Sequence, residues 1–103
     1  MTDVWFVYIV RCADASLYTG IARDVAARIA QHDAGKGARY TRGRGPLALL
    51  AKMRCDGQGE ALRIEARVKG LSKAEKLALV RRIKRSAKGA RLSILEALRR
   101  GAS

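Results

Sequence analysis

The fold is decided near the N-terminus, by the stretch Val4-Trp-Phe-Val-Tyr-Ile-Val-Arg11 and the second stretch Ser16-Leu-Tyr-Thr-Gly-Ile-Ala22. Both contain aromatic and β-branched residues that favour strands, and the short segment between them is typical of a hairpin connection. Side chains alternate between the two faces of a strand, and the first stretch is apolar on both, so the sheet needs cover on both sides. We therefore predict two paired strands that bring Tyr8 and Tyr18 into one neighbourhood.

The second stretch carries a glycine, Gly20, inside its predicted strand. A glycine there often marks a place where another group approaches the backbone closely. A twist or a bulge in the strand explains Gly20 equally well, so the sequence leaves both interpretations open.

The composition is that of one small domain with an unusual charge balance. The chain has 103 residues, and 22 Lys and Arg against 9 Asp and Glu give a formal net charge of +13. Such an excess favours polyanionic partners, above all nucleic acid, with an anionic membrane surface as a second candidate.

No stretch approaches the roughly 18 apolar residues of a membrane span, and no signal-peptide pattern is visible. We expect a cytoplasmic protein in which Cys12 and Cys55 are free buried thiols rather than a disulfide or a redox pair.

Capping and turn signals divide the next part of the chain, up to about residue 86, into three helices, one strand and one loop. Asp24 is a good N-cap, and Ser72-Lys-Ala-Glu75 is a capping box, so each predicts the start of a helix. The pattern over 47–54 fits a strand or a helix, and the neighbouring Pro46 and Gly57 favour a strand. The expected elements are a helix over 25–34, a loop over 33–46, a short strand over 47–54, a helix over 58–69 and a helix from 72 to about 86.

These elements predict an α+β fold, in which a three-stranded antiparallel sheet is flanked by helices in the order β-β-α-β-α-α. We assign this domain to residues 1–86. Residues 87–103 form a basic C-terminal extension, in which a second capping box, Ser93-Ile-Leu-Glu96, predicts one more short helix.

The helix over 25–34 places two polar side chains beside its apolar stripe. Val25 and Ile29 form that stripe, and Arg28 and His32 fall within roughly 60° of Val25 in projection. An arginine is seldom buried without a partner, so Arg28 is a candidate functional residue. His32 at the edge of the stripe is structural as often as it is functional.

The helix over 58–69 carries an acidic residue, Glu65, inside a broad apolar side made of Ala61, Leu62, Ile64, Ala66 and Val68. An ionised carboxylate that faces a core is costly unless a cation or a metal ion meets it. Two explanations stay open for Glu65, an ion pair with Arg28 and ligation of a metal.

The loop over 33–46 gathers cations around one aromatic ring. These residues are Lys36, Arg39, Tyr40, Arg42 and Arg44, with only Asp33 to offset their charge. A solvated, flexible loop is the plain interpretation of any one of these charges. Taken together, the cations, the flexible backbone amides and the ring favour phosphate contacts combined with base stacking.

The set Tyr8, Tyr18, Gly20, Arg28, His32 and Glu65, in this order and spacing, resembles the GIY-YIG nuclease superfamily. The similarity is strongest to its small stand-alone bacterial branch of YhbQ-like proteins and covers about residues 4–83. Phe6-Val7-Tyr8 corresponds to the first family motif and Tyr18-Thr19-Gly20 to the second. Two features depart from the family pattern. Ile21 stands where some relatives have a lysine, and the chain contains no asparagine, which larger members carry downstream of the glutamate.

The resemblance implies hydrolysis of phosphodiester bonds in nucleic acid with a single divalent metal, Mg²⁺ or Mn²⁺. Glu65 would bind the metal, Arg28 would stabilise charge on the phosphate, and Tyr8 or Tyr18 would take the proton from the attacking water. His32 would share the role of base or bond a phosphate. An ordinary phenol with a pKa near 10 is a poor base at neutral pH, so we expect Arg28 and the metal to lower the pKa of the catalytic tyrosine.

Two functions of different classes stay open at this point. One is a metal-dependent endonuclease, with DNA favoured over RNA as substrate. The other is a basic nucleic-acid-binding module that keeps the fold and cleaves little or nothing. We expect neither membrane association nor an obligate protein partner, and a role as a partner-binding adaptor has no support beyond the unassigned tail.

Overall fold

The computed structural model describes residues 3–85 of the chain, and these form a sheet with helices on both sides. The elements are β1 (Val4–Arg11), β2 (Leu17–Ala22), α1 (Val25–Asp33), the 3-10 helix η1 (Arg39–Thr41), β3 (Ala48–Asp56), α2 (Gln58–Lys69) and α3 (Lys73–Arg85). The predicted α+β order is confirmed, with η1 as an addition inside the predicted loop. The third strand ends at Asp56, two residues later than expected. The predicted extension over 87–103 and its helix lie outside the described residues.

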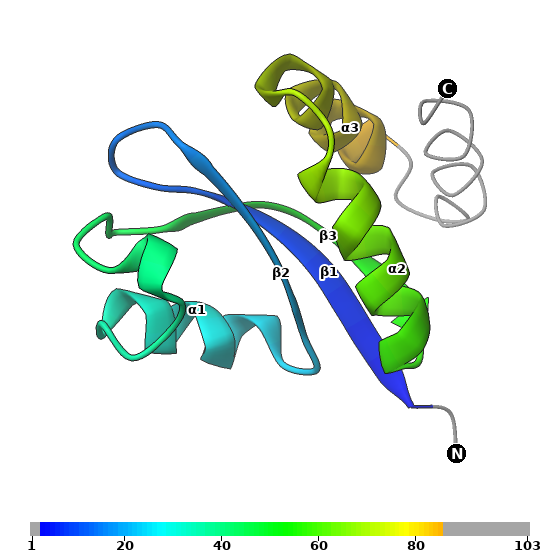
Figure 1. Ribbon diagram of the computed structural model, residues 1–103, viewed down its shortest axis with the longest axis horizontal. Coiled ribbons are helices and arrows are strands. Elements are labelled where there is room, and N and C mark those ends of the chain that lie inside the picture. Colours follow the sequence, from blue (N-terminus) through cyan, green and yellow to red (C-terminus); the bar gives the residue numbers. More distant parts are fainter. Residues whose placement is uncertain (1–2, 86–103) are drawn as a thin grey trace.

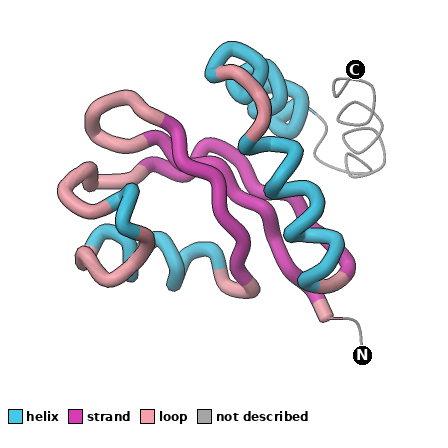
Figure 2. The backbone as a smooth tube through the Cα atoms, in the orientation of Figure 1, coloured by secondary structure: helices cyan, strands magenta, loops and turns pink. Residues whose placement is uncertain are grey.

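The sheet has the order β2-β1-β3, and both pairings are antiparallel. β1 is therefore the central strand, and Tyr8 faces Gly20 on β2 and Lys52 on β3. In Figure 1, α1 and η1 lie to one side of the strands while α2 and α3 lie to the other. The tube view in Figure 2 shows the three strands running side by side between these two groups.

A separate hydrophobic cluster covers each face of the sheet. One contains Val7 and Ile9 of β1 with residues of α2 and α3, among them Ile64 and Leu79. The other contains Tyr8, Val10 and Cys12 with Val25 of α1 and Leu47. The alternation along β1 thus sends neighbouring residues into different cores, and the predicted cover on both faces is confirmed.

The apolar side of α2 is narrower than the sequence predicted. Ala61, Ile64 and Val68 are buried as expected, but Ala66 is exposed and 47% of Leu62 is accessible to solvent. A helix packed on a sheet buries only the stripe at positions i, i+3 and i+7. Leu62 follows Ala61 directly, so its side chain is rotated by about 100° around the helix axis, away from that stripe. Glu65 lies next to this stripe.

The local signals for helix ends and thiols are confirmed. The Asp24 carboxylate accepts a hydrogen bond of 3.0 Å from the Ala27 N–H. In the capping box, the Ser72 N–H donates to Glu75 at 2.8 Å and the Glu75 N–H donates to the Ser72 hydroxyl oxygen at 3.1 Å. Cys12 and Cys55 are free and buried. Within residues 3–85, no helix has both the length and the apolar character that crossing a membrane requires.

Gly20 is a point of close approach, as one of the two interpretations predicted. A Cβ atom at Gly20 would lie 2.5 Å from the Tyr8 hydroxyl oxygen. The register between β1 and β2 runs past Gly20 without interruption, so no bulge is needed to explain the glycine. The Tyr8 ring can lie across β2 because Gly20, the residue opposite Tyr8 on that strand, has no side chain.

Replacing Gly20 by alanine tests this packing. We expect Gly20→Ala to destabilise the fold by about 1–3 kcal/mol, because the Tyr8 ring must move within a closed core. Chemical denaturation measures the free energy of unfolding. Gly59→Ala is the matched control: the nearest atom to a Cβ there lies at an ordinary 3.5 Å, and alanine favours a helix, so stability should rise by up to about 1 kcal/mol. Equal stability of Gly20→Ala and wild type would contradict the packing described.

Candidate functional site

Four aromatic rings form a cluster that joins β1, β2, α1 and the loop before β3. The Tyr8 and Tyr18 ring centroids lie 6.4 Å apart, which confirms the predicted neighbourhood of the two tyrosines. The His32 ring meets Tyr18 edge-on at 5.4 Å, and Tyr40 stacks on Tyr18 at 5.8 Å. The cluster is therefore one continuous wall built from distant parts of the chain.

The Tyr8 hydroxyl is bonded to His32 in the interior. The Tyr8 oxygen lies 2.9 Å from His32 Nε2, and Tyr8 and His32 are only 1% and 2% exposed. On the other side of the imidazole, the Ala38 N–H donates to Nδ1 at 3.1 Å, and the Thr41 hydroxyl oxygen lies 2.9 Å from the same nitrogen. Both nitrogens of His32 are thus engaged by protein groups.

Arg28 is half-buried and acts on the same hydroxyl. Its guanidinium donates to the Gln31 side-chain oxygen at 2.9 Å. Burial and the nearby Tyr18 raise the pKa of Tyr8 to about 12, while the charge and hydrogen bonding of Arg28 pull it downward. Arg28 thus lowers the pKa of Tyr8 as expected, but desolvation outweighs it in the free protein. The lowering expected from a bound metal stays a prediction. Burial, followed by the charge of Arg28, also lowers the pKa of His32.

Glu65 of α2 acts on the site through its charge. Its side chain is only 17% exposed, and one carboxylate oxygen lies 3.4 Å from the Lys69 ammonium, one helical turn later. One interpretation of the sequence paired Glu65 with Arg28. In the structure, the ion pair of Glu65 is with Lys69 instead. The Glu65 charge also contributes to the raised pKa of Tyr8, which connects α2 electrostatically with the aromatic cluster.

The donor set around Glu65 limits the kind of metal that fits. Among the described residues, no group of three or more His, Cys, Asp or Glu side chains is placed to hold a metal ion. A single carboxylate fits a hydrated Mg²⁺ or Mn²⁺ that takes its remaining ligands from water and a phosphate. It does not fit a tightly held ion with a full set of protein ligands.

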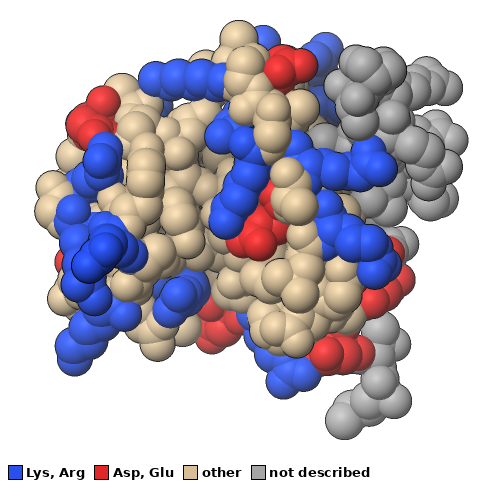
Figure 3. All heavy atoms as spheres, in the orientation of Figure 1, with Lys and Arg blue, Asp and Glu red and all other residues tan. Residues whose placement is uncertain are grey.

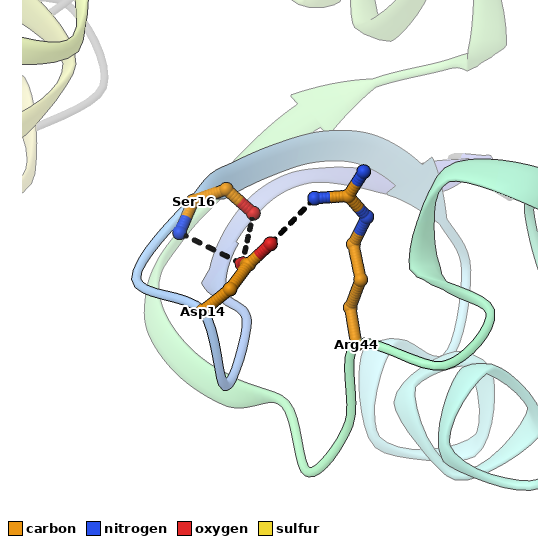
Figure 4. A network of polar contacts seen from close by, with 3 residues as sticks. All are labelled: Asp14, Ser16 and Arg44. Carbon is orange, nitrogen blue, oxygen red and sulfur yellow. Dashed lines mark hydrogen bonds and ion pairs between the residues drawn. The ribbon is translucent and has the colours of Figure 1, made fainter.

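The basic loop is fastened to the β1–β2 hairpin through Arg44. The Arg44 guanidinium lies 2.5 Å from the Asp14 carboxylate, which also accepts hydrogen bonds from the backbone and hydroxyl of Ser16 (Figure 4). The same guanidinium lies over the Tyr40 ring, 4.4 Å from its centroid. Tyr18 and Arg44 thus already engage Tyr40, and Arg44 is committed to protein contacts.

The other three loop cations, Lys36, Arg39 and Arg42, are exposed. Figure 3 shows Lys and Arg side chains gathered on the side of α1 and the loop, and again along α2.

Three residues at the site were missed from the sequence. Lys69 could have been found, because it stands four residues after Glu65, the spacing at which helical ion pairs form. Gly37 and Thr41 gave no local signal. Gly37 lies so close to His32 that a Cβ atom would overlap Nδ1, and Thr41 is buried against the same ring. Their importance depends on a contact between α1 and a loop that only the folded chain makes.

Residues 4–78 match the GIY-YIG catalytic domain family. A UPF0213 protein of Nitratidesulfovibrio vulgaris is 52% identical over 65% of this chain, and the matched region spans 61% of that protein's length. A UPF0213 protein of Vibrio cholerae is 52% identical over 68% of this chain and 70% of its own length.

Two solution structures have a similar fold. A UPF0213 protein from Bacillus halodurans has a TM-score of 0.50 and 44% identity, over 90% of this chain and 94% of that one. A protein from E. faecalis has a TM-score of 0.52 and 28% identity, over 77% of this chain and 88% of that one. The similarity to the first of these extends over nearly the whole length of both chains.

The raised pKa of Tyr8 predicts a pH dependence of stability. The ordinary tyrosine pKa is 10.0 and that of folded Tyr8 is about 12, so the folded state favours the neutral phenol. The resulting stabilisation is complete below pH 10 and is lost as the pH rises toward 12. Phenolate absorbance should show one of the three tyrosines titrating last, and Tyr8→Phe should remove that step. Titration of Tyr8 at or below its ordinary pKa would contradict the assignment.

Proposed function

The chain belongs to the GIY-YIG catalytic domain family, and we propose that it is a metal-dependent endonuclease that hydrolyses phosphodiester bonds in nucleic acid, DNA in preference to RNA. The observation that carries this proposal is the convergence of unlike groups on the Tyr8 hydroxyl. His32 and Arg28 reach it from α1, and the Glu65 charge acts on it from α2. A base, a cation and a metal-binding carboxylate in one place are what phosphodiester hydrolysis requires.

Arg28 is suited to hold the scissile phosphate. Its planar guanidinium can meet two phosphate oxygens at once, and its half-buried position keeps it partly shielded from water. One of its N–H groups bonds Gln31, which restricts the orientation of the fork. The charge that develops on the phosphate in the transition state would thus meet a positioned donor instead of a mobile one.

Tyr8 is the tyrosine that we assign as the base. It carries the hydroxyl on which the other groups act, whereas Tyr18 is half-buried and serves as the surface on which Tyr40 and His32 pack. Three features hold the Tyr8 proton in the free protein: burial, then the neighbouring Tyr18, and least of all the negative charge of Glu65. A cation at Glu65 would cancel the last of these, and Arg28 already opposes all three.

Glu65 is the residue that would hold Mg²⁺ or Mn²⁺. When bound, such an ion supplies Lewis-acid stabilisation of the phosphate and of the leaving oxygen. Lys69 neutralises the Glu65 carboxylate until then, and its half-exposed ammonium is free to turn toward solvent or a phosphate.

A second function, that of a binding module with little or no cleavage, has its own support. In the free protein the Tyr8 pKa is about 12, and Glu65 is paired with Lys69. A protein left in this state would bind nucleic acid through its cations without activating water. The cleavage assay below separates the two functions.

We also propose a reducing, cytoplasmic setting for the protein. Both cysteines are free thiols, and they lie in different cores, Cys12 in one and Cys55 in the other. The fold therefore does not need a disulfide between them. Free buried thiols are typical of reducing compartments.

Cleavage tests the proposed function through Glu65→Gln. With plasmid DNA, branched DNA and RNA in the presence of Mg²⁺ or Mn²⁺, we expect cleavage by wild type and a loss on the order of 100-fold or more in Glu65→Gln. Glu60→Gln on the same helix is the matched control. Its carbonyl oxygen can still accept the hydrogen bond from the Asp56 N–H, and its activity should remain near wild type. Binding of every substrate without cleavage would favour the binding module, and full cleavage by Glu65→Gln would rule out the metal-binding role.

Salt dependence tests the nucleic-acid surface. Arg39→Ala and Arg42→Ala should each weaken binding about equally for different sequences and reduce the slope of log K against log salt by up to about 1. Lys73→Ala, an exposed cation at the start of α3, is the comparison and should change the slope less. Fluorescence anisotropy with labelled duplex and single-stranded oligonucleotides measures the affinity. Equal slopes for all three variants and wild type would show that the loop cations do not contact the nucleic acid.

A further inference from the structure

We propose that the turn over residues 37–41 fixes His32 as the neutral tautomer with its proton on Nε2, so that His32 donates a hydrogen bond to Tyr8. Thr41 is then a positioning residue that holds this turn. The catalytic consequence rests on the proposed function, whereas the tautomer itself is a property of the free protein.

The Nδ1 side of the ring determines the tautomer. The Ala38 backbone N–H donates to Nδ1 at 3.1 Å, and a backbone amide can only donate. Nδ1 must therefore carry its lone pair, and a neutral imidazole with a free Nδ1 has its proton on Nε2. The burial of His32 favours the neutral ring, because a buried imidazolium would present a second N–H to an amide that is itself a donor.

Thr41 holds the Ala38 amide in place. Its backbone N–H donates to the Ala38 carbonyl oxygen at 3.1 Å, and its hydroxyl oxygen lies 2.8 Å from the same carbonyl oxygen. The hydroxyl oxygen also lies 2.9 Å from His32 Nδ1. Thr41 is 1% exposed, so no water competes with these contacts. The hydroxyl has one hydrogen to donate, and with the lone pair on Nδ1 it donates to Nδ1, while the backbone N–H of Thr41 holds the turn.

Gly37 lets the turn approach the His32 ring closely. A Cβ atom at this position would overlap Nδ1 and the neighbouring carbons of the ring, so a side chain would push the turn away from His32. With glycine, the backbone passes directly over the edge of the imidazole. The ring is thus confined between this turn and Tyr8.

At Tyr8, the tautomer decides which partner holds the proton of the hydrogen bond. With the proton on Nε2, His32 donates to the Tyr8 oxygen across 2.9 Å, and the hydroxyl hydrogen of Tyr8 points away from His32. A phenolate at Tyr8 would then accept from His32 as well as from Arg28, which favours its formation. In the other tautomer Tyr8 would have to donate to His32, and a phenolate would face a lone pair. His32 therefore supports the base and does not share its role.

The single histidine of the chain makes the tautomer directly measurable. Two-bond proton–nitrogen correlation spectra of the ¹⁵N-labelled free protein near pH 7 distinguish the protonated ring nitrogen from the unprotonated one. We expect one neutral form with the proton on Nε2. A wild-type spectrum with the proton on Nδ1, or with two forms in comparable amounts, would overturn the proposal.

Two substitutions at Thr41 then test its positioning role. Thr41→Val removes the hydroxyl with little change in shape and should produce a mixture of tautomers, whereas Thr41→Ser should keep the wild-type spectrum. In the cleavage assay, Thr41→Val should lose about tenfold in kcat with KM for nucleic acid nearly unchanged, and Thr41→Ser should restore kcat. An unchanged tautomer in a folded Thr41→Val protein would overturn the role of Thr41. If no variant cleaves but the spectra behave as expected, the proposed function fails and the tautomer assignment is supported.

Discussion

The hydrogen bond between the Tyr8 hydroxyl and His32 is the contact on which the site depends. It joins the central strand to α1 in a region where neither partner is exposed, so a lost bond would leave a buried polar group unpaired. Two glycines make the bond possible, because Gly20 lets the Tyr8 ring cross β2 and Gly37 lets the loop close over His32. The sheet register, the position of α1 and the path of the loop must all be correct together for this one bond to form.

The sequence predicted the parts of the fold that local rules control. The β-branched and aromatic runs, the Asp24 cap and the box from Ser72 to Glu75 each identified an element correctly. The breadth of the buried side of α2 was overestimated at Leu62, because a helical projection cannot show how much of a helix its neighbours cover. The Lys69 partner of Glu65 follows a local spacing rule and could have been predicted. The contacts of Gly37 and Thr41 with His32 could not, since they arise where a loop meets a helix.

The charges at the site oppose one another in the free protein. Burial, Tyr18 and Glu65 hold the proton on Tyr8, while Arg28 favours its loss. Lys69 compensates Glu65, and Asp14 compensates Arg44. A phosphate would add negative charge beside Arg28, and a divalent ion would add positive charge beside Glu65. In the function that we propose, substrate and cation together would shift this balance toward a phenolate at Tyr8.

We propose that strand, helix and loop residues around Tyr8 form one nucleic-acid-binding catalytic centre. Chemical-shift mapping with a cleavage-resistant oligonucleotide, followed by paramagnetic broadening on adding Mn²⁺, tests it most directly. The oligonucleotide should shift the signals of Tyr8, Tyr18, Arg28 and residues 36–44, and Mn²⁺ should broaden those nearest Glu65 only when the oligonucleotide is present. Shifts confined to the outer face of α3, with broadening remote from Glu65, would show that nucleic acid and metal do not meet at Tyr8.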